Sequence, residues 1–192
     1  MTLRPHTAEA LEIFRELVSS FIDHPEALQV EVREFPGAAY WSVLPHADDY
    51  GKVCGRKGAH IRALTQLLAR IGSTNGERWR LRLPEPEPGP RRESSPAVQM
   101  KTYDPTRAEE LLARSVGAAL GCDVVVDSEE IADEKLSYLL RIRAPVEPGA
   151  FARLTVTQAG DAAEQPLIAR LGVLWRAWGH ADGVSFRIEA AP

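Results

Sequence analysis

The middle of this chain is unsuited to regular secondary structure. The stretch "PEPEPGPRRESSPAVQM", from Pro84 to Met100, contains five prolines and two adjacent serines. Proline fixes its own backbone and lacks an N–H donor, so this composition favours an extended, semi-rigid connector. The connector divides the 192 residues nearly in half. We therefore expect one domain over residues 1–84, a linker over 85–100 and a second domain over 101–192.

The first half carries a regular succession of helical and strand patterns. Thr7 is a suitable N-cap for the first helix, Pro25 is its expected end, and Pro36-Gly37 marks a turn between two alternating segments. The spacing of apolar residues predicts six elements. They are a helix between Thr7 and Pro25, strands over 27–35 and 38–45, helices over about 48–54 and 59–71, and a strand over 78–84. The predicted order is α-β-β-α-α-β.

The second half repeats this order less clearly. Its predicted elements are a helix from Asp104-Pro105 to about Leu120, strands over 122–128 and 135–144, a helix over about 166–178 and a strand over 184–190. A shift of 107 residues places Ile61 on Ile168, Gly72 on Gly179 and Trp79 on Phe186. This internal repeat predicts that both halves share one α+β fold.

A glycine-bounded pair of cations, Gly55-Arg56-Lys57-Gly58, precedes the predicted helix that begins at Ala59. The glycines permit a tight turn and close approach of a ligand, and the helix start adds unpaired N–H groups and a positive dipole end. Residues 51–82 contain eight cations and one anion, a net charge of +7, whereas the aligned residues 158–189 have a net charge of −1. The first half is therefore suited to a polyanion, and the second half lacks the loop.

The segment "VCGRKGAHI" resembles the signature of KH domains, in which an aliphatic pair precedes Gly-x-x-Gly and another aliphatic residue follows. The element order resembles the type II, bacterial arrangement, and the segment from Thr7 to Pro84 is most similar to small KhpA-type RNA-binding proteins. Cys54 stands where the pattern usually has isoleucine. The second half resembles a KH domain only in element order and in its aligned tail, so we expect a degenerate KH-like α+β domain without Gly-x-x-Gly.

The resemblance implies that the chain binds single-stranded RNA. In KH domains this loop holds roughly four nucleotides by their backbone, while the bases lie on an apolar groove. By resemblance, Gly55, Arg56, Lys57 and Gly58 contact the RNA backbone. The other candidate RNA-binding residues are Lys52, Val53, Cys54, Ile61 and Arg62, with Leu44 as a further groove residue. The resemblance implies no catalytic residue, cofactor or metal ion, and another KH protein or a second copy of the chain is a further candidate partner.

Several features of the first half have more than one interpretation. The loop could be an ordinary solvated turn, and both halves could instead form a protein–protein interaction module in which the loop is a relic. An enzyme would have to use Cys54 with His46 or His60, although helical spacing directs Cys54 toward the apolar groove. The alternating arginines over 78–82 suit either RNA or the wet face of a half-buried strand.

Other features point to structure or exclude whole classes of protein. Trp175 and Trp178 share one helical face, which core packing explains best, with a base-stacking platform or a protein interface as the alternative. The net charge of −4 gives no whole-chain indication of a nucleic-acid binder, so local charge has to decide. Two distant cysteines and histidines without ligand spacing indicate neither a disulfide framework nor a metal site. The cysteine usage fits a reducing, cytoplasmic home. The N-terminus lacks an apolar core of signal-peptide length and no apolar run approaches the length of a membrane span, so we expect a soluble, cytoplasmic protein.

Overall fold

The computed structural model describes residues 3–85, 105–131, 137–143, 167–182 and 185–190. The predicted linker therefore lies almost wholly outside the described residues, as do residues 162–165, which align with the loop. The first half has the predicted element order. Its elements are α1 (Pro5–Ser19), β1 (Gln29–Phe35), β2 (Ala38–Leu44), α2 (Tyr50–Cys54), α3 (Ala59–Thr74) and β3 (Arg78–Arg82), with short 3-10 turns at Pro25–Ala27, Ala47–Asp49 and Arg56–Gly58.

The predicted ends of the first helix are wrong at both termini. The helix α1 begins at Pro5, with Arg4 as N-cap, so Thr7 is a buried residue of the first turn and caps nothing. Pro suits a first helical position because its missing N–H would have no helical partner there. At the other end the helix stops at Ser19, before Pro25, which begins a separate 3-10 turn.

Arg4 fixes the start of α1 to the sheet. Its Nε donates to Glu34 of β1 at 2.9 Å, and its guanidinium also pairs with Glu77, just before β3. Burial acts to raise the pKa of Glu34, but hydrogen bonds, including those from Arg4, outweigh burial and lower it. Contacts that span 30 and 73 residues thus set this helix boundary.

The second half has the same sheet topology as the first. Its described elements are α4 (Pro105–Leu120), β4 (Val125–Ile131), β5 (Ser137–Arg143), α6 (Leu167–Asp182) and β6 (Ser185–Ala190). In each sheet the first two strands pair antiparallel and the third pairs parallel to the second. The register also coincides, because Val30 faces Val43 in the first sheet and Val126 faces Ile142 in the second.

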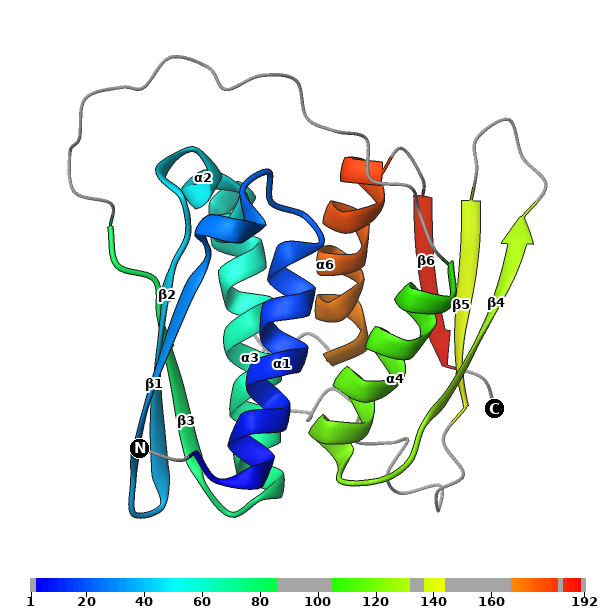
Figure 1. Cartoon of the computed structure of the whole chain (residues 1–192). Coiled ribbons are helices and arrows are strands. Elements are labelled where there is room, and N and C mark those ends of the chain that lie inside the picture. Colours follow the sequence, from blue (N-terminus) through cyan, green and yellow to red (C-terminus); the bar gives the residue numbers. More distant parts are fainter. Residues whose placement is uncertain (1–2, 86–104, 132–136, 144–166, 183–184, 191–192) are drawn as a thin grey trace.

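The helices lie between the two sheets. Figure 1 shows α1 and α3 covering one face of the β1-β2-β3 sheet, with α4 and α6 between them and the β4-β5-β6 sheet. The helix α3 contacts β3 on one side and both α4 and α6 on the other. One continuous core therefore spans both halves of the chain.

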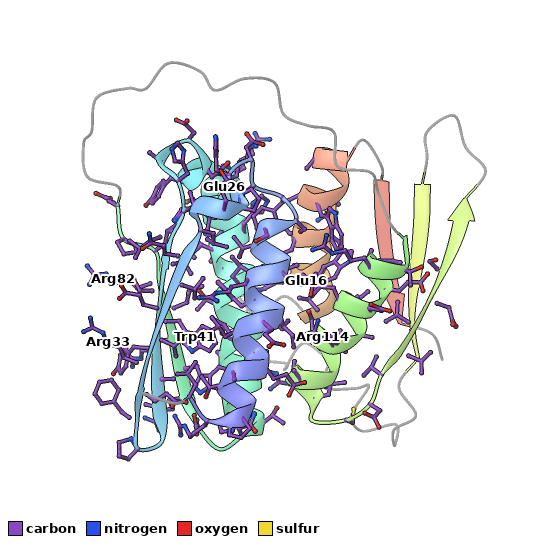
Figure 2. All side chains as sticks on the ribbon, viewed as in Figure 1. Glu16, Glu26, Arg33, Trp41, Arg82 and Arg114 are labelled. Carbon is purple, nitrogen blue, oxygen red and sulfur yellow. The ribbon has the colours of Figure 1, made fainter. Side chains whose placement is uncertain are left out.

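Large apolar side chains fill this core. Trp41 on β2 is 1% exposed and packs against Phe14, and its label in Figure 2 lies between the first sheet and α1. Trp175 and Trp178 are buried on α6, which agrees with the core role expected for them. The other fully buried members of α4 and α6 include Ala108, Leu111, Leu112, Val116, Leu171 and Leu174.

Ion pairs border the contact between α1 and α4. Arg107 and Arg114 of α4 donate to the two carboxylate oxygens of Glu16 at 3.1 and 3.0 Å. Figure 2 shows Glu16 and Arg114 facing each other between the two helices. Because these pairs are part-exposed, they contribute little beside the apolar core.

The repeated glycine of the two halves has a packing role. A Cβ on Gly72 would lie 2.6 Å from Cγ of Trp79, closer than real Cβ contacts allow. The absence of a side chain lets α3 rest directly on the indole ring of β3. Gly179 is the aligned glycine, and it is also buried.

Candidate nucleic-acid interface

Three residues of the loop between α2 and α3 have positive φ values. Gly55 ends α2 at φ 73° and ψ 165°, Lys57 lies at φ 54°, and Gly58 precedes α3 at φ 73°. The Gly58 N–H donates to the Gly55 carbonyl at 2.9 Å, which closes the turn. Glycine adopts such conformations at no steric cost, so both loop glycines suit the backbone that the structure requires.

Gly55 also lacks room for a side chain. A Cβ there would lie 2.5 Å from Cγ of His60 and 2.7 Å from its backbone nitrogen. The His60 ring is fixed in turn, because its Nδ1 lies 2.6 Å from the Lys52 carbonyl. A carbonyl only accepts, so Nδ1 carries the proton of this bond. The loop is therefore held tightly between the end of α2 and the start of α3.

Arg56 and Lys57 project their charges from this loop into solvent. Both are exposed, and among the described residues neither forms an ion pair. The loop stands at the N-terminus of the 16-residue helix α3, where unpaired N–H groups and the helix dipole favour an anion. The two cations and the N-terminus of α3 would therefore all attract a phosphate group.

Two of the other predicted cations have partners within the protein. Lys52 Nζ pairs with the Asp23 carboxylate and lies 3.9 Å from Asp49. Arg62 donates through Nη1 to the Lys57 carbonyl at 2.6 Å. The Lys52 and Arg62 side chains are thus engaged in contacts within the protein. Arg56 and Lys57 are therefore the cations best placed to bind a ligand.

The apolar candidates differ in exposure. Val53 is fully buried and belongs to the core beneath the loop, so it offers no surface to a ligand in this structure. Cys54, Ile61 and Leu44 are half-buried and keep part of their surface available to a ligand. The apolar surface beside the loop is therefore smaller than the sequence suggested.

A histidine–carboxylate cluster near α2 has no counterpart in the sequence analysis. Ligand atoms of His24, His46 and Asp48 all lie within 4.8 Å of one another. Asp49 is fully buried and accepts from the backbone N–H groups of Asp23 and His24 at 2.9 and 2.8 Å. His24 and His46 are far apart in the sequence, so no local spacing could have indicated this cluster.

The comparisons with known proteins match the first half. A family model described as the KH domain of KhpA/KhpB matches residues 12–83. RNA-binding protein KhpA of Streptomyces coelicolor is 41% identical over 64 residues, which are 33% of this chain and 77% of that protein. RNA-binding protein KhpA of Listeria monocytogenes is 27% identical over 74 residues, 38% of this chain and 97% of that protein. No solved structure matches this chain significantly.

An α-β-β-α-α-β fold with a glycine-bounded loop between its last two helices defines a KH domain, and residues 12–83 form one. The similarity to curated relatives is high enough, and covers enough of their length, to specify the family. This chain belongs to the KhpA family of RNA-binding proteins.

Among the described residues, no helix combines the length and apolarity that crossing a bilayer requires.

Proposed function

We propose that this chain binds single-stranded RNA through the Gly55–Gly58 loop and catalyses no covalent reaction. The observation that carries the proposal is the placement of Arg56 and Lys57. Both are exposed on a rigid loop at a helix N-terminus, without an ion-pair partner among the described residues. The relatives named RNA-binding protein KhpA support RNA as the ligand.

The shape of the loop favours a single strand. Two positive-φ glycines bring backbone atoms to the surface, so that a sugar-phosphate chain can approach closely. Half-buried Cys54 and Ile61 beside the loop offer apolar contact to unpaired bases. A duplex would present its paired bases to each other and leave this apolar surface unused.

The predicted contact residues divide into three groups in this proposal. Gly55, Arg56, Lys57 and Gly58 contact the RNA backbone, and Cys54 and Ile61 contact bases. Lys52 and Arg62 position the loop through their contacts with Asp23 and the Lys57 carbonyl.

We further propose that residues 101–192 form a degenerate KH-like half that serves as a structural partner for the first. The shared sheet topology and register support this relationship. Residues 162–165, which align with the loop, contain no glycine and one acidic side chain, Glu164. The second half thus covers the helices of the first and contributes no equivalent RNA loop.

Competition between single-stranded and duplex RNA tests the proposed function. The intact chain should bind a labelled single strand, and an unlabelled strand of the same sequence should compete at least about tenfold better than its duplex, since only unpaired bases can reach the apolar surface. Fluorescence anisotropy at fixed salt measures both competitors. Equal competition by the duplex would contradict single-strand binding.

A further inference from the structure

The outer face of the first sheet, opposite the helices, carries an ordered arrangement of aromatic and basic side chains. The strand register sets three rows across β1, β2 and β3. The central row is Arg33, Tyr40 and Arg80. The flanking rows are Phe35, Ala38 and Arg78 on one side, and Glu31, Ser42 and Arg82 on the other. We call these nine residues the sheet surface.

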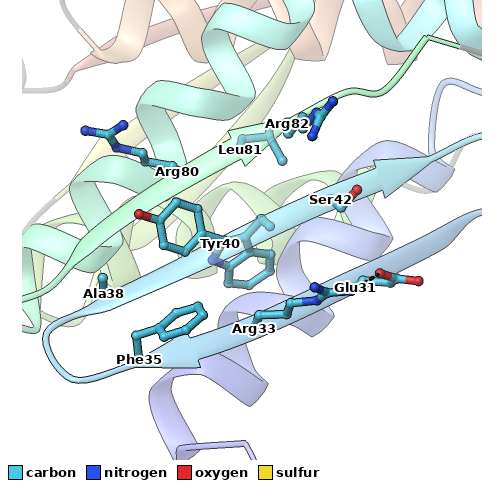
Figure 3. A pocket seen from close by; sticks show the side chains of 10 residues that line it. Glu31, Arg33, Phe35, Ala38, Tyr40, Ser42, Arg80, Leu81 and Arg82 are labelled. Atoms are coloured by element: carbon cyan, nitrogen blue, oxygen red, sulfur yellow. Dashed lines mark ion pairs between the residues drawn. The ribbon is translucent and has the colours of Figure 1, made fainter.

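Two aromatic rings of the sheet surface are exposed to solvent. Phe35 and Tyr40 are 51% and 50% exposed, and their ring centroids lie 5.5 Å apart at an interplanar angle of 89°. Figure 3 shows both rings on the open side of the strands. They help to line a concave region of about 920 Å³. Large aromatic side chains at this exposure can stack with flat ligands.

The arginines of the sheet surface are available to an anion. Arg78, Arg80 and Arg82 are exposed, and within the described parts of the chain none of them forms an ion pair. Arg33 approaches Glu31 only at 4.0 Å, and both side chains are mostly exposed. Four arginines against one glutamate give this face a net charge of +3.

The second sheet provides an internal comparison at identical register positions. The positions of Arg33, Phe35, Tyr40 and Arg82 are occupied there by Glu129, Ile131, Leu139 and Glu189. Every second residue of each strand, counted in register with Arg33, Tyr40 and Arg80, gives the first sheet a net charge of +3. The equivalent positions of the second sheet hold three arginines and three acidic residues, a net charge of zero. Strand geometry alone therefore requires neither the positive charge nor the aromatic rings.

One end of the sheet surface lies near the Gly55–Gly58 loop, because the chain leaves β2 at that end and then runs through α2 to the loop. The strand β2 ends at Leu44, and the helix α2 begins at Tyr50 and leads directly to Gly55. The row of Ser42 and Arg82 is the row nearer to that end. In Figure 1, β2 runs up the sheet toward α2. An RNA strand bound at the loop would therefore continue past this end of the sheet onto the sheet surface.

We propose that the sheet surface is a second contact site for the same single-stranded RNA, in which Tyr40 and Phe35 stack with bases and Arg33, Arg80 and Arg82 neutralise phosphates. Neighbouring strands lie about 4.8 Å apart and alternate residues about 6.6 Å apart, so the surface suits roughly two or three nucleotides. The proposal rests on the proposed function, because it takes RNA as the ligand. The combination of positive charge and exposed rings fits a nucleic-acid strand better than it fits a protein partner.

Binding of a short and a long RNA separates the two sites. The probes are labelled single strands of random sequence, about 5 and about 20 nucleotides long, because the loop alone should hold roughly four nucleotides. The sheet variants are R80Q/R82Q and Tyr40→Thr, which retain polar side chains and strand propensity. The matched control R141Q/R187Q removes two arginines from the second sheet, at the positions equivalent to Ser42 and Arg80.

Each sheet variant should bind the long RNA about tenfold more weakly than the parent, and R80Q/R82Q should lower the salt-dependence slope by about 1.4. Both should bind the short RNA within about twofold of the parent, as should the control with either RNA. If the sheet variants bind the long RNA like the parent, the second RNA site does not exist. That conclusion also holds if the same variants fail to bind a protein partner. If a charge-reversed loop retains short-RNA binding, the proposed function itself is overturned.

Discussion

Changing Arg56 and Lys57 together to Asp should abolish measurable binding of single-stranded RNA at physiological salt. The substitution places two anions beside the phosphates and opposes the helix dipole of α3. Each lost phosphate contact should also lower the salt-dependence slope by about 0.7. Both side chains are exposed and without ion pairs among the described residues, so the free energy of unfolding should change by no more than about 0.5 kcal/mol. Anisotropy titrations and urea unfolding measure the two effects.

A matched control distinguishes the loop from the net charge of the protein. Arg15 on α1 and Arg176 on α6 are also exposed, and changing both to Asp alters the net charge by the same amount. This control should retain RNA binding within a few-fold of the parent, since long-range charge acts weakly at physiological salt. If the loop variant and the control lose affinity equally, the loop has no special role. If neither loses affinity, the alternative of a protein-interaction module with a relic loop becomes the better account.

Removing the second half should leave a fragment that does not persist as a stable monomer. Residues 1–85 contain every element of the KH domain, but the fragment would uncover the faces of α1 and α3 that α4 and α6 bury. Leu111, Leu112 and Trp175 are among the side chains that would leave this core. Full burial of each such side chain contributes about 1.5–3 kcal/mol, so the total loss is large unless another surface replaces them.

A second copy of the fragment is the available replacement. The relatives are about as long as the first half alone, since 64 residues make up 77% of one and 74 residues make up 97% of the other. Sedimentation should therefore show the intact chain as a monomer and the 1–85 fragment as a self-associated species. A fragment that sediments as a monomer and unfolds at the same urea concentration as the intact chain would show that α4 and α6 do not stabilise the first half.

Local patterns predicted the elements of this fold well because each element has a strong period. Strand alternation around Pro36-Gly37 and helical spacing after Ala59 gave β1, β2 and α3 nearly as they stand. The errors lie at the ends. The strand β4 begins at Val125, later than the predicted residue 122, because Gly121 at φ 72° and the N–H of Cys122 cap α4 by bonding back to Gly117. Such caps depend on backbone conformation that residue spacing does not report.

The candidate site was predictable only in part. Glycine spacing and local charge identified the loop, because both properties lie within a few consecutive residues. The partners of the flanking cations could not be found this way. Lys52 pairs with Asp23, which lies 29 positions earlier, and the burial of Val53 depends on packing from elements distant in the sequence. The sheet surface likewise depends on strand register, which joins Arg33 to Tyr40 and Tyr40 to Arg80.

The most direct test of the central claim is to map the RNA contact on the isotope-labelled intact chain by NMR. Titration with a single strand of about five nucleotides, close to the roughly four that a KH loop holds, should perturb the backbone amides of Gly55, Arg56, Lys57 and Gly58 first. The amides of the following first turn of α3 should respond with them, whereas those of α4 and α6 should stay unchanged. If the perturbed amides lie on α4 or α6 while those of Gly55 to Gly58 do not move, the loop is not where this protein binds RNA.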